Sequence, residues 1–274
     1  MIAFICIDVD GTLVGREGTV RPAVWAAVDE VRVAGIRLAL CSGRPAMGRA
    51  LEYAARLDPD GWHIFQNGAS VLHLPTGESR SFHLPAPAVD RLVARARRRG
   101  EVLELYTDTD YAVEHDADRA RRHAALLGVP FRPRALESAG PGVVRAQWLV
   151  SHEAADEVEA EARQDAGVTV SPSLSPVMPD TRFFSVTSDG IDKASAVRSV
   201  AEAYGVPLER VMMVGDGAND APAMRIVGHP VAMGDAEPEA MAAARHVVAD
   251  VEGEGLVQAL RLALRLRAER DDIG

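Results

Sequence analysis

Short apolar runs alternate along this chain with segments in which apolar residues recur at helical spacing. Residues 2–8 and 36–41 are near-continuous apolar runs, which is typical of strands that are buried on both faces of a sheet. Between them, Val24, Val28 and Val31 recur every three or four residues, so a helix is predicted there. Strands that alternate with helices in this way predict an α/β fold with a doubly wound parallel sheet.

The middle of the chain departs from this pattern. Several prolines precede a series of short strands and helices, and a loop rich in Pro and Gly follows at 128–142. We interpret residues 85–187 as an inserted α+β domain with an open sheet. The predicted core domain is then formed by residues 1–84 and 188–274, on either side of the insert.

The first apolar run ends in two aspartates that are one residue apart, Asp8 and Asp10. Because successive strand residues point to opposite faces, both carboxylates are expected on the same side if the strand extends that far. They repel each other and resist desolvation, which a divalent cation relieves. Gly11 permits a tight turn, and Thr12 adds a hydroxyl and a backbone N–H. The stretch predicts a metal and phosphate site, although alone it also fits a strand followed by an Asp-Gly turn.

Other polar groups also follow predicted strands. Ser42 follows residues 36–41, and Asp216 and Asp220 follow an apolar run at 210–214. Ligands of doubly wound sheets bind beyond the carboxyl ends of the strands, so these groups are expected to meet Asp8 there. A hard dication with oxygen ligands relieves the repulsion among these carboxylates, and Mg²⁺ suits a site with few carboxylates, several waters and a substrate phosphate. No His or Cys in these motifs has the spacing of zinc ligands.

Together these motifs resemble those of the haloacid dehalogenase (HAD) superfamily of phosphohydrolases. The family motif D-x-D-G-T matches Asp8–Thr12, the second motif ends at Ser42, the third is Lys193 at a helix start, and G-D-x-x-N-D matches Gly215–Asp220. The long gap between the second and third motifs, together with the segment Gln66–Ala69, is similar to the Cof-type branch, subclass IIB. The resemblance implies a Rossmann-like core with an inserted α+β cap domain.

The resemblance also implies residue roles. Asp8 would be the nucleophile that forms an aspartyl-phosphate, and Asp10 would be the general acid and then the general base. Metal ligation would come from Asp8, Asp10 (through its backbone carbonyl), Asp216 and Asp220. Phosphate binding would come from Gly11, Thr12, Ser42, Gly43, Lys193 and Asn219. Candidate substrate contacts are Arg44, Asn67, Tyr106, Arg145 and Arg182.

Some of these candidates have structural alternatives. Arg44 could pair with an acidic neighbour instead of a substrate, and Asn67 could be a turn residue that tolerates left-handed geometry. The eight histidines show no spacing pattern, so we interpret them as structural or solvated. Three positions differ from the usual family pattern without removing a catalytic group: Gln66, Ala194 and Pro222.

Charge and composition narrow the possible partners. The formal net charge of −10 and the pI near 5.3 argue against nucleic acid and against an anionic membrane surface as partners. An anionic substrate would need a locally positive pocket. Cys6 and Cys41 lie in apolar runs and are expected to be buried and free. The chain opens on a strand, with no basic segment or cleavage site, so a cytoplasmic location is expected.

The function predicted from these observations is Mg²⁺-dependent hydrolysis of small phosphorylated metabolites, such as sugar phosphates or cofactor phosphates. One alternative keeps the chemistry but returns the phosphoryl group to the substrate, as a phosphomutase does. Another is a non-catalytic metabolite-binding module. A binding module would not need Asp10, so the complete set of acids and lysine argues against it.

Overall fold

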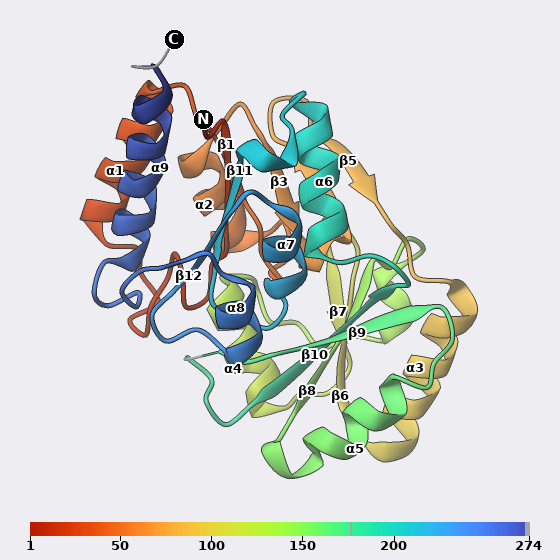
Figure 1. Cartoon of the computed structure of the whole chain (residues 1–274). Coiled ribbons are helices and arrows are strands. Elements are labelled where there is room, and N and C mark those ends of the chain that lie inside the picture. Colours follow the sequence, from red (N-terminus) through yellow and green to blue (C-terminus); the bar gives the residue numbers. More distant parts are fainter. Residues whose placement is uncertain (176, 272–274) are drawn as a thin grey trace.

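The computed structural model describes residues 1–175 and 177–271, and a parallel sheet lies at the centre of its larger part (Figure 1). The strand order is β13-β12-β11-β1-β2, with parallel pairing throughout, so β1 lies between β11 and β2. This sheet confirms the predicted α/β class. Its strands are β1 (Phe4–Ile7), β2 (Arg37–Leu40), β11 (Val211–Gly215), β12 (His229–Ala232) and β13 (His246–Val247).

Helices cover both faces of this sheet because successive residues of β1 point to opposite faces. Ile5 and Ile7 pack into one apolar cluster with α1, α2 and α9, whereas Phe4 and Cys6 pack into another with α6, α7 and α8. Both cysteines are buried and free. The helices are α1 (Pro22–Val33), α2 (Gly48–Leu57), α6 (Lys193–Ala203), α7 (Ala221–Ile226), α8 (Pro238–Ala243) and α9 (Gly255–Asp271), with a short 3-10 turn, η3 (Leu208–Arg210). Among the described residues, no helix combines the length and apolarity that crossing a membrane requires.

A small antiparallel sheet continues from the edge of the parallel sheet. Its order is β3-β4-β5, and a single bridge between Cys41 and Ile64 connects it to the chain that leaves β2. Its strands are β3 (Trp62–Phe65), β4 (Ser70–His73) and β5 (Glu78–Ser81). The turn η1 (Gln66–Gly68) follows β3, and both Gln66 and Asn67 have φ of 55° there.

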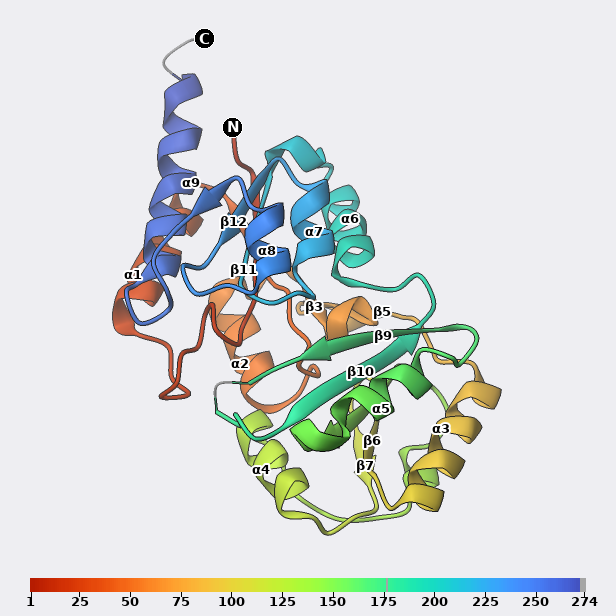
Figure 2. The same cartoon turned by 60° about the horizontal axis from the view of Figure 1, so that its bottom comes forward.

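A separate antiparallel sheet lies within residues 102–188, in the segment predicted to form the cap. Its order is β7-β6-β8-β10-β9. Figure 2 shows α3 and α5 on the side of this sheet that faces away from the parallel sheet. The limits of the cap at 85 and 187 stay predictions. The elements are α3 (Ala86–Arg99), β6 (Val102–Tyr106), β7 (Tyr111–Val113), α4 (Asp118–Leu127), η2 (Leu136–Ala139), β8 (Arg145–Val150), α5 (His152–Ala162), β9 (Val168–Ser173) and β10 (Arg182–Ser188).

His63 on β3 is buried in its neutral form. The backbone N–H of Leu40 donates to its Nδ1 at 3.1 Å, so the proton of the neutral ring lies on Nε2, which donates to the carbonyl of Asp58 at 2.8 Å. Burial lowers the pKa of His63 to about 4. Through these two hydrogen bonds the His63 ring links β2 to the turn before β3, within the core domain.

We expect His63 to make the fold sensitive to acid. In the unfolded chain the pKa of His63 is about 6.5. Its contribution to the unfolding free energy is therefore complete above that pH and is lost as the pH falls toward 4. The difference corresponds to about 3 kcal/mol of unfolding free energy. Urea titrations between pH 8 and pH 4 should give a weaker pH dependence for His63→Gln. The control His83→Gln, at an exposed position, should keep the wild-type dependence of the unfolding free energy on pH. If the unfolding free energy varies equally with pH in both variants, His63 does not have this role.

Candidate active site

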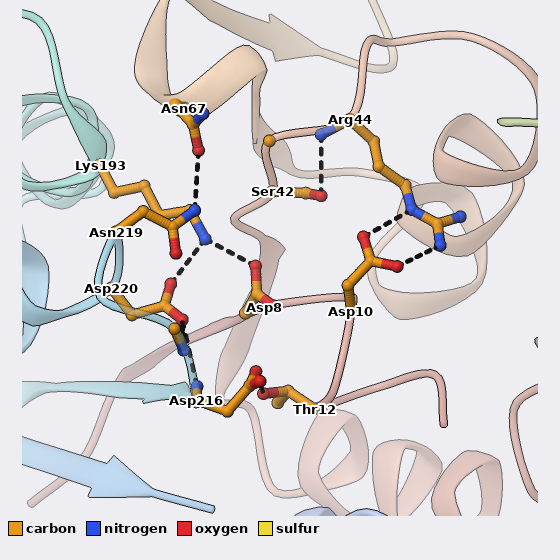
Figure 3. A network of polar contacts seen from close by, with 12 residues as sticks. Asp8, Asp10, Thr12, Ser42, Arg44, Asn67, Lys193, Asp216, Asn219 and Asp220 are labelled. Carbon is orange, nitrogen blue, oxygen red and sulfur yellow. Dashed lines mark hydrogen bonds and ion pairs between the residues drawn. The ribbon is translucent and has the colours of Figure 1, made fainter. Parts of the chain in front are cut away.

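Polar groups from neighbouring parallel strands meet at the carboxyl edge of the sheet (Figure 3). Asp8 follows β1, Asp216 follows β11, and Ser42 lies just beyond β2. Because β1 lies between the other two strands, Asp8 is central among these groups. The sheet therefore brings together residues that are far apart in sequence, as the doubly wound topology predicts.

Lys193 occupies the centre of this group. It is the first residue of α6 and is 1% exposed. Its Nζ donates to Asp8 Oδ1 and to Asp220 Oδ1, both at 2.6 Å. Burial alone would lower the pKa of Lys193, but the charges of Asp220 and Asp8 raise it well above its usual value. These two carboxylates offset the unfavourable position of a cation at a helix N-terminus.

The helix start that positions Lys193 is well defined. Asp192 caps α6 by accepting from the backbone N–H of Ser195 at 2.8 Å, and the Ser195 hydroxyl completes a capping box. Lys193 is also the only lysine among the 30 Lys and Arg residues of the chain. In a chain that otherwise uses arginine, a single lysine is itself a sequence signal for a special role at this position.

Three carboxylates form a cluster that could hold a cation. Asp8, Asp216 and Asp220 each offer an oxygen within 4.8 Å of the others. Burial, reinforced by neighbouring negative charge, raises the pKa of Asp8 to about 7 despite the opposing effect of Lys193, and raises that of Asp216 well above its usual value. With all three carboxylates ionised, the cluster would carry more negative charge than Lys193 balances, and a bound cation would relieve this excess. Oxygen donors of this kind fit a hard divalent cation such as Mg²⁺.

The loops around the cluster hold these carboxylates in place. The hydroxyl of Thr12 donates to Asp216 Oδ1 at 2.8 Å. Asp220 Oδ2 accepts from the backbone N–H groups of Asp216 and Gly217 at 3.1 and 3.0 Å. Gly11 has φ of 87°, and a Cβ there would lie 2.1 Å from Asp216 Oδ2. Glycine is therefore required where the first loop approaches the second.

Asp10 points away from this cluster and pairs with Arg44. Nε of Arg44 donates to Asp10 Oδ2 at 2.9 Å, and Nη2 donates to Oδ1 at 2.5 Å. Burial would raise the pKa of Asp10, but the charge and hydrogen bonds of Arg44 lower it, and His123 contributes in the same direction. Of the two alternatives left open for Arg44, the structure has the acidic neighbour.

The other polar contacts around the site involve side-chain amides and backbone groups of the neighbouring loops. Asn219 Nδ2 donates to Asn67 Oδ1 at 3.0 Å, and the Ser42 hydroxyl accepts from the backbone N–H of Arg44 at 3.1 Å. Asn67 thus has both of the properties considered for it, a left-handed turn and a position beside the site. Gln66, a departure from the family pattern, donates through Nε2 to the Thr107 carbonyl in the cap at 3.0 Å.

A cavity of about 450 Å³ opens between the core and the antiparallel sheet. Asp8, Asp10 and Asp216 line it from the core, and Arg145 lines it from the cap. Of the other cap candidates, neither Tyr106 nor Arg182 is among the described residues that line this cavity. The cap side of the cavity also holds polar residues that were not predicted from the sequence: His123, Gln147 and Ser185.

Two of the histidines interpreted as structural or solvated, His123 and His152, form part of the cavity wall. A sequence signal for the cap residues does exist. Arg145 and Gln147 are polar positions two residues apart in the otherwise largely apolar run 143–150. Period-two polar residues in a buried strand mark a polar face.

Comparison with known proteins agrees with this geometry. The family model for haloacid dehalogenase-like hydrolases matches residues 5–260. A 5-amino-6-(5-phospho-D-ribitylamino)uracil phosphatase from Bacillus subtilis is 25% identical and is covered over 95% of both chains. An HMP-PP phosphatase from Cronobacter sakazakii is 22% identical, over 88% of this chain and 87% of the relative.

Solved structures show the same fold. A haloacid dehalogenase-like hydrolase from Bacteroides thetaiotaomicron superimposes with a TM-score of 0.84 at 24% identity, covering 95% of this chain and 99% of that one. The family match extends over both the parallel sheet and the cap sheet. The chain therefore belongs to the haloacid dehalogenase-like hydrolases and is a capped phosphatase of that family.

Proposed function

We propose that this phosphatase is Mg²⁺-dependent and hydrolyses small phosphorylated metabolites through an aspartyl-phosphate on Asp8. One observation carries the proposal. Asp8 lies in a carboxylate cluster that can hold a cation, its Oδ1 contacts the ammonium of Lys193, and it shares its cavity with a second carboxylate, Asp10. A nucleophile, a positive charge and an acid–base group are the components that a phosphoryl transfer by covalent catalysis needs.

The proposed reaction has two steps. Asp8 attacks phosphorus through a carboxylate oxygen, the bond from phosphorus to the ester oxygen breaks, and the leaving alcohol takes its proton from Asp10. Asp10 then accepts a proton from a water molecule, which attacks phosphorus and releases inorganic phosphate and Asp8. Arg44 lowers the pKa of Asp10, so this contact favours the second proton transfer, in which Asp10 is the base, and opposes the first, in which Asp10 is the acid.

The other residues neutralise charge and position the phosphoryl group. Lys193 offsets negative charge on Asp8, while the Ser42 hydroxyl and the backbone N–H groups near Gly11 and Thr12 are available to phosphoryl oxygens. Mg²⁺ held by Asp8, Asp216 and Asp220 would neutralise the remaining negative charge of the carboxylates and the substrate. Asn219 supports this loop through Asn67.

A panel of phosphate esters tests the proposal directly. Inorganic phosphate should be released from small esters with Mg²⁺ and not after treatment with a chelator. An isomerised ester without phosphate release would instead indicate a mutase. Binding without turnover of any ester, including a generic aryl phosphate, would indicate a metabolite-binding module.

Metal binding should also stabilise the fold. Mg²⁺ at about 100 times its dissociation constant should add roughly 2.7 kcal/mol to the unfolding free energy, because the unfolded chain has no such cluster. Asp216→Ala should lose most of this gain, whereas Glu239→Ala, at an exposed position of α8, should keep it. A melting temperature that is unchanged by Mg²⁺ in the wild type would contradict the metal site.

A further inference from the structure

One face of the cap sheet is apolar, and the other face combines polar residues with a second apolar cluster that includes Leu149. On β8, Ala146, Trp148 and Val150 belong to the apolar cluster formed with α3 and α5. The alternate residues, Arg145 and Gln147, therefore lie on the opposite face and line the cavity. Figure 2 shows that α3 and α5 leave this face of the sheet turned toward the core. Cross-strand partners add further polar groups to this face: Glu104 and Ser185 beside Gln147, and Tyr106 beside Arg145.

These polar residues are buried, with Glu104 0% exposed and both Arg145 and Gln147 3% exposed. Buried polar groups cost free energy unless they are hydrogen-bonded. A polar face of this kind, lining a cavity beside a reaction centre, is expected to be retained because a ligand uses it.

Arg145 has unused hydrogen-bonding capacity. Its guanidinium lies over the ring of Tyr106, with 4.3 Å between Cζ and the ring centroid. Nη1 donates across the cavity edge to the carbonyl of Gly43, beside Ser42. Nε and Nη2 are buried and have no hydrogen-bond partner among the described residues. A buried cation with two unpaired donors is costly unless an anion completes it.

The nearby carboxylate does not complete it. Oε2 of Glu104 accepts from the Tyr106 hydroxyl at 2.6 Å and from Nδ1 of His123 at 2.8 Å. No ion pair joins Glu104 to Arg145 in the described part of the chain. Glu104 therefore orients His123, whose ring forms part of the cavity wall, and leaves the donors of Arg145 available.

Charge in the cavity is distributed unevenly. The cap wall presents Arg145, His123 and Gln147. The core rim of the same cavity presents carboxylates and Arg16; the carboxylates are Asp235, Glu237, Asp250 and Glu252. An anionic substituent is repelled by that rim and attracted to the cap wall.

We propose that the substrate's organic part carries a second anionic group, a carboxylate or a phosphate, and that Arg145 binds it with support from His123 and Gln147. Arginine recognises both groups through paired charge-assisted hydrogen bonds. A cavity of about 450 Å³ limits the substrate to a small metabolite. This inference rests on the proposed function, because it concerns the leaving group of that reaction.

The test measures binding, not turnover, so that it is independent of catalysis. Three phosphonates with the same propyl chain are titrated by calorimetry into the Mg²⁺-loaded protein. They are propylphosphonate, 4-phosphonobutyrate and propane-1,3-diphosphonate, and their C–P bond replaces the hydrolysable ester bond. The two ligands with a charged second end should bind about ten- to a hundred-fold more tightly than propylphosphonate. Comparison of these two distinguishes a carboxylate from a phosphate as the preferred group.

Variants assign the preference to Arg145. In Arg145→Gln the ratio of affinities between charged and uncharged phosphonates should fall close to one. Arg121→Gln, which removes an exposed cap arginine paired with Asp116, should keep the wild-type ratio. His123→Gln should lower the ratio by less than Arg145→Gln, and it provides a second variant if Arg145→Gln fails to fold.

Each outcome decides between the two proposals. Equal wild-type affinities for the three phosphonates, or a ratio unchanged in Arg145→Gln, would overturn the anionic subsite even if esters are hydrolysed. The expected binding ratios in a protein that hydrolyses no ester would support the subsite and overturn the proposed phosphatase reaction. If neither variant folds, wild-type affinities that are equal for the three phosphonates still overturn the subsite.

Discussion

Asp8→Asn should lower the turnover rate about a thousand-fold or more while leaving the protein folded. Asparagine has nearly the same shape as aspartate but lacks the charged oxygen that would attack phosphorus. Lys193 keeps its contact with Asp220 in this variant, so the positive charge of the site stays in place. Phosphate release from an aryl phosphate in the presence of Mg²⁺ measures the loss.

The same substitution should not lower the unfolding free energy, which distinguishes it from a substitution that disrupts core packing. Burial raises the pKa of Asp8 to about 7, from about 4 in an unfolded chain. Ionised Asp8 therefore costs folding free energy as the pH rises from 4 to 7. Without divalent metal at pH 8, Asp8→Asn should melt at or above the wild-type temperature. Turnover near the wild-type rate would exclude Asp8 as the nucleophile.

A matched control for this variant is Asp90→Asn on the exposed side of α3. It makes the same change of one carboxylate to an amide but lies outside the cavity. We expect it to keep both turnover and melting temperature. A similar loss in both variants would indicate a general effect of charge instead of a specific role for Asp8.

Positions at strand ends were predictable from the sequence because they follow from local rules. The apolar run before Asp8 and the one before Asp216 each end where the polar residues begin, and parallel strands place such ends at one edge of a sheet. The Gly11 turn was predictable for the same reason. These features depend on alternation and on chain geometry, not on side-chain conformation.

Side-chain partners between loops were less predictable. The pairing of Arg44 with Asp10 depends on the conformation of two loops that meet only in the folded chain, so the residues alone left a substrate contact equally open. His123 reaches the cavity because Glu104 on another strand orients its ring. Burial of Tyr106 behind Arg145 likewise depends on the register of β6 with β8. Sequence periodicity does not specify such registers.

Lys193 is the residue whose substitution should combine the largest effects on activity and stability. Its ammonium lies between Asp8 and Asp220, and all three side chains are buried. Lys193→Met removes the cation and leaves two buried carboxylates without their partner, which typically costs about 3–5 kcal/mol. In a protein of this size the melting temperature should fall on the order of 10 °C. Turnover of all esters should fall together, because every substrate shares the phosphoryl group.

Two further variants separate charge from geometry at this position. Lys193→Arg keeps the charge, but its planar guanidinium is larger than the ammonium that fits between the two carboxylates at 2.6 Å, so activity should not return. Adding Asp220→Asn to Lys193→Met removes one of the unpaired charges and should recover part of the lost stability without restoring turnover.

Arg198→Met, an exposed change on the same helix, serves as the control. If Lys193→Met melts like Arg198→Met and keeps its turnover, the two buried ion pairs contribute neither to folding nor to catalysis. In that case the use of lysine at this one position, in a chain that otherwise uses arginine, would need another cause.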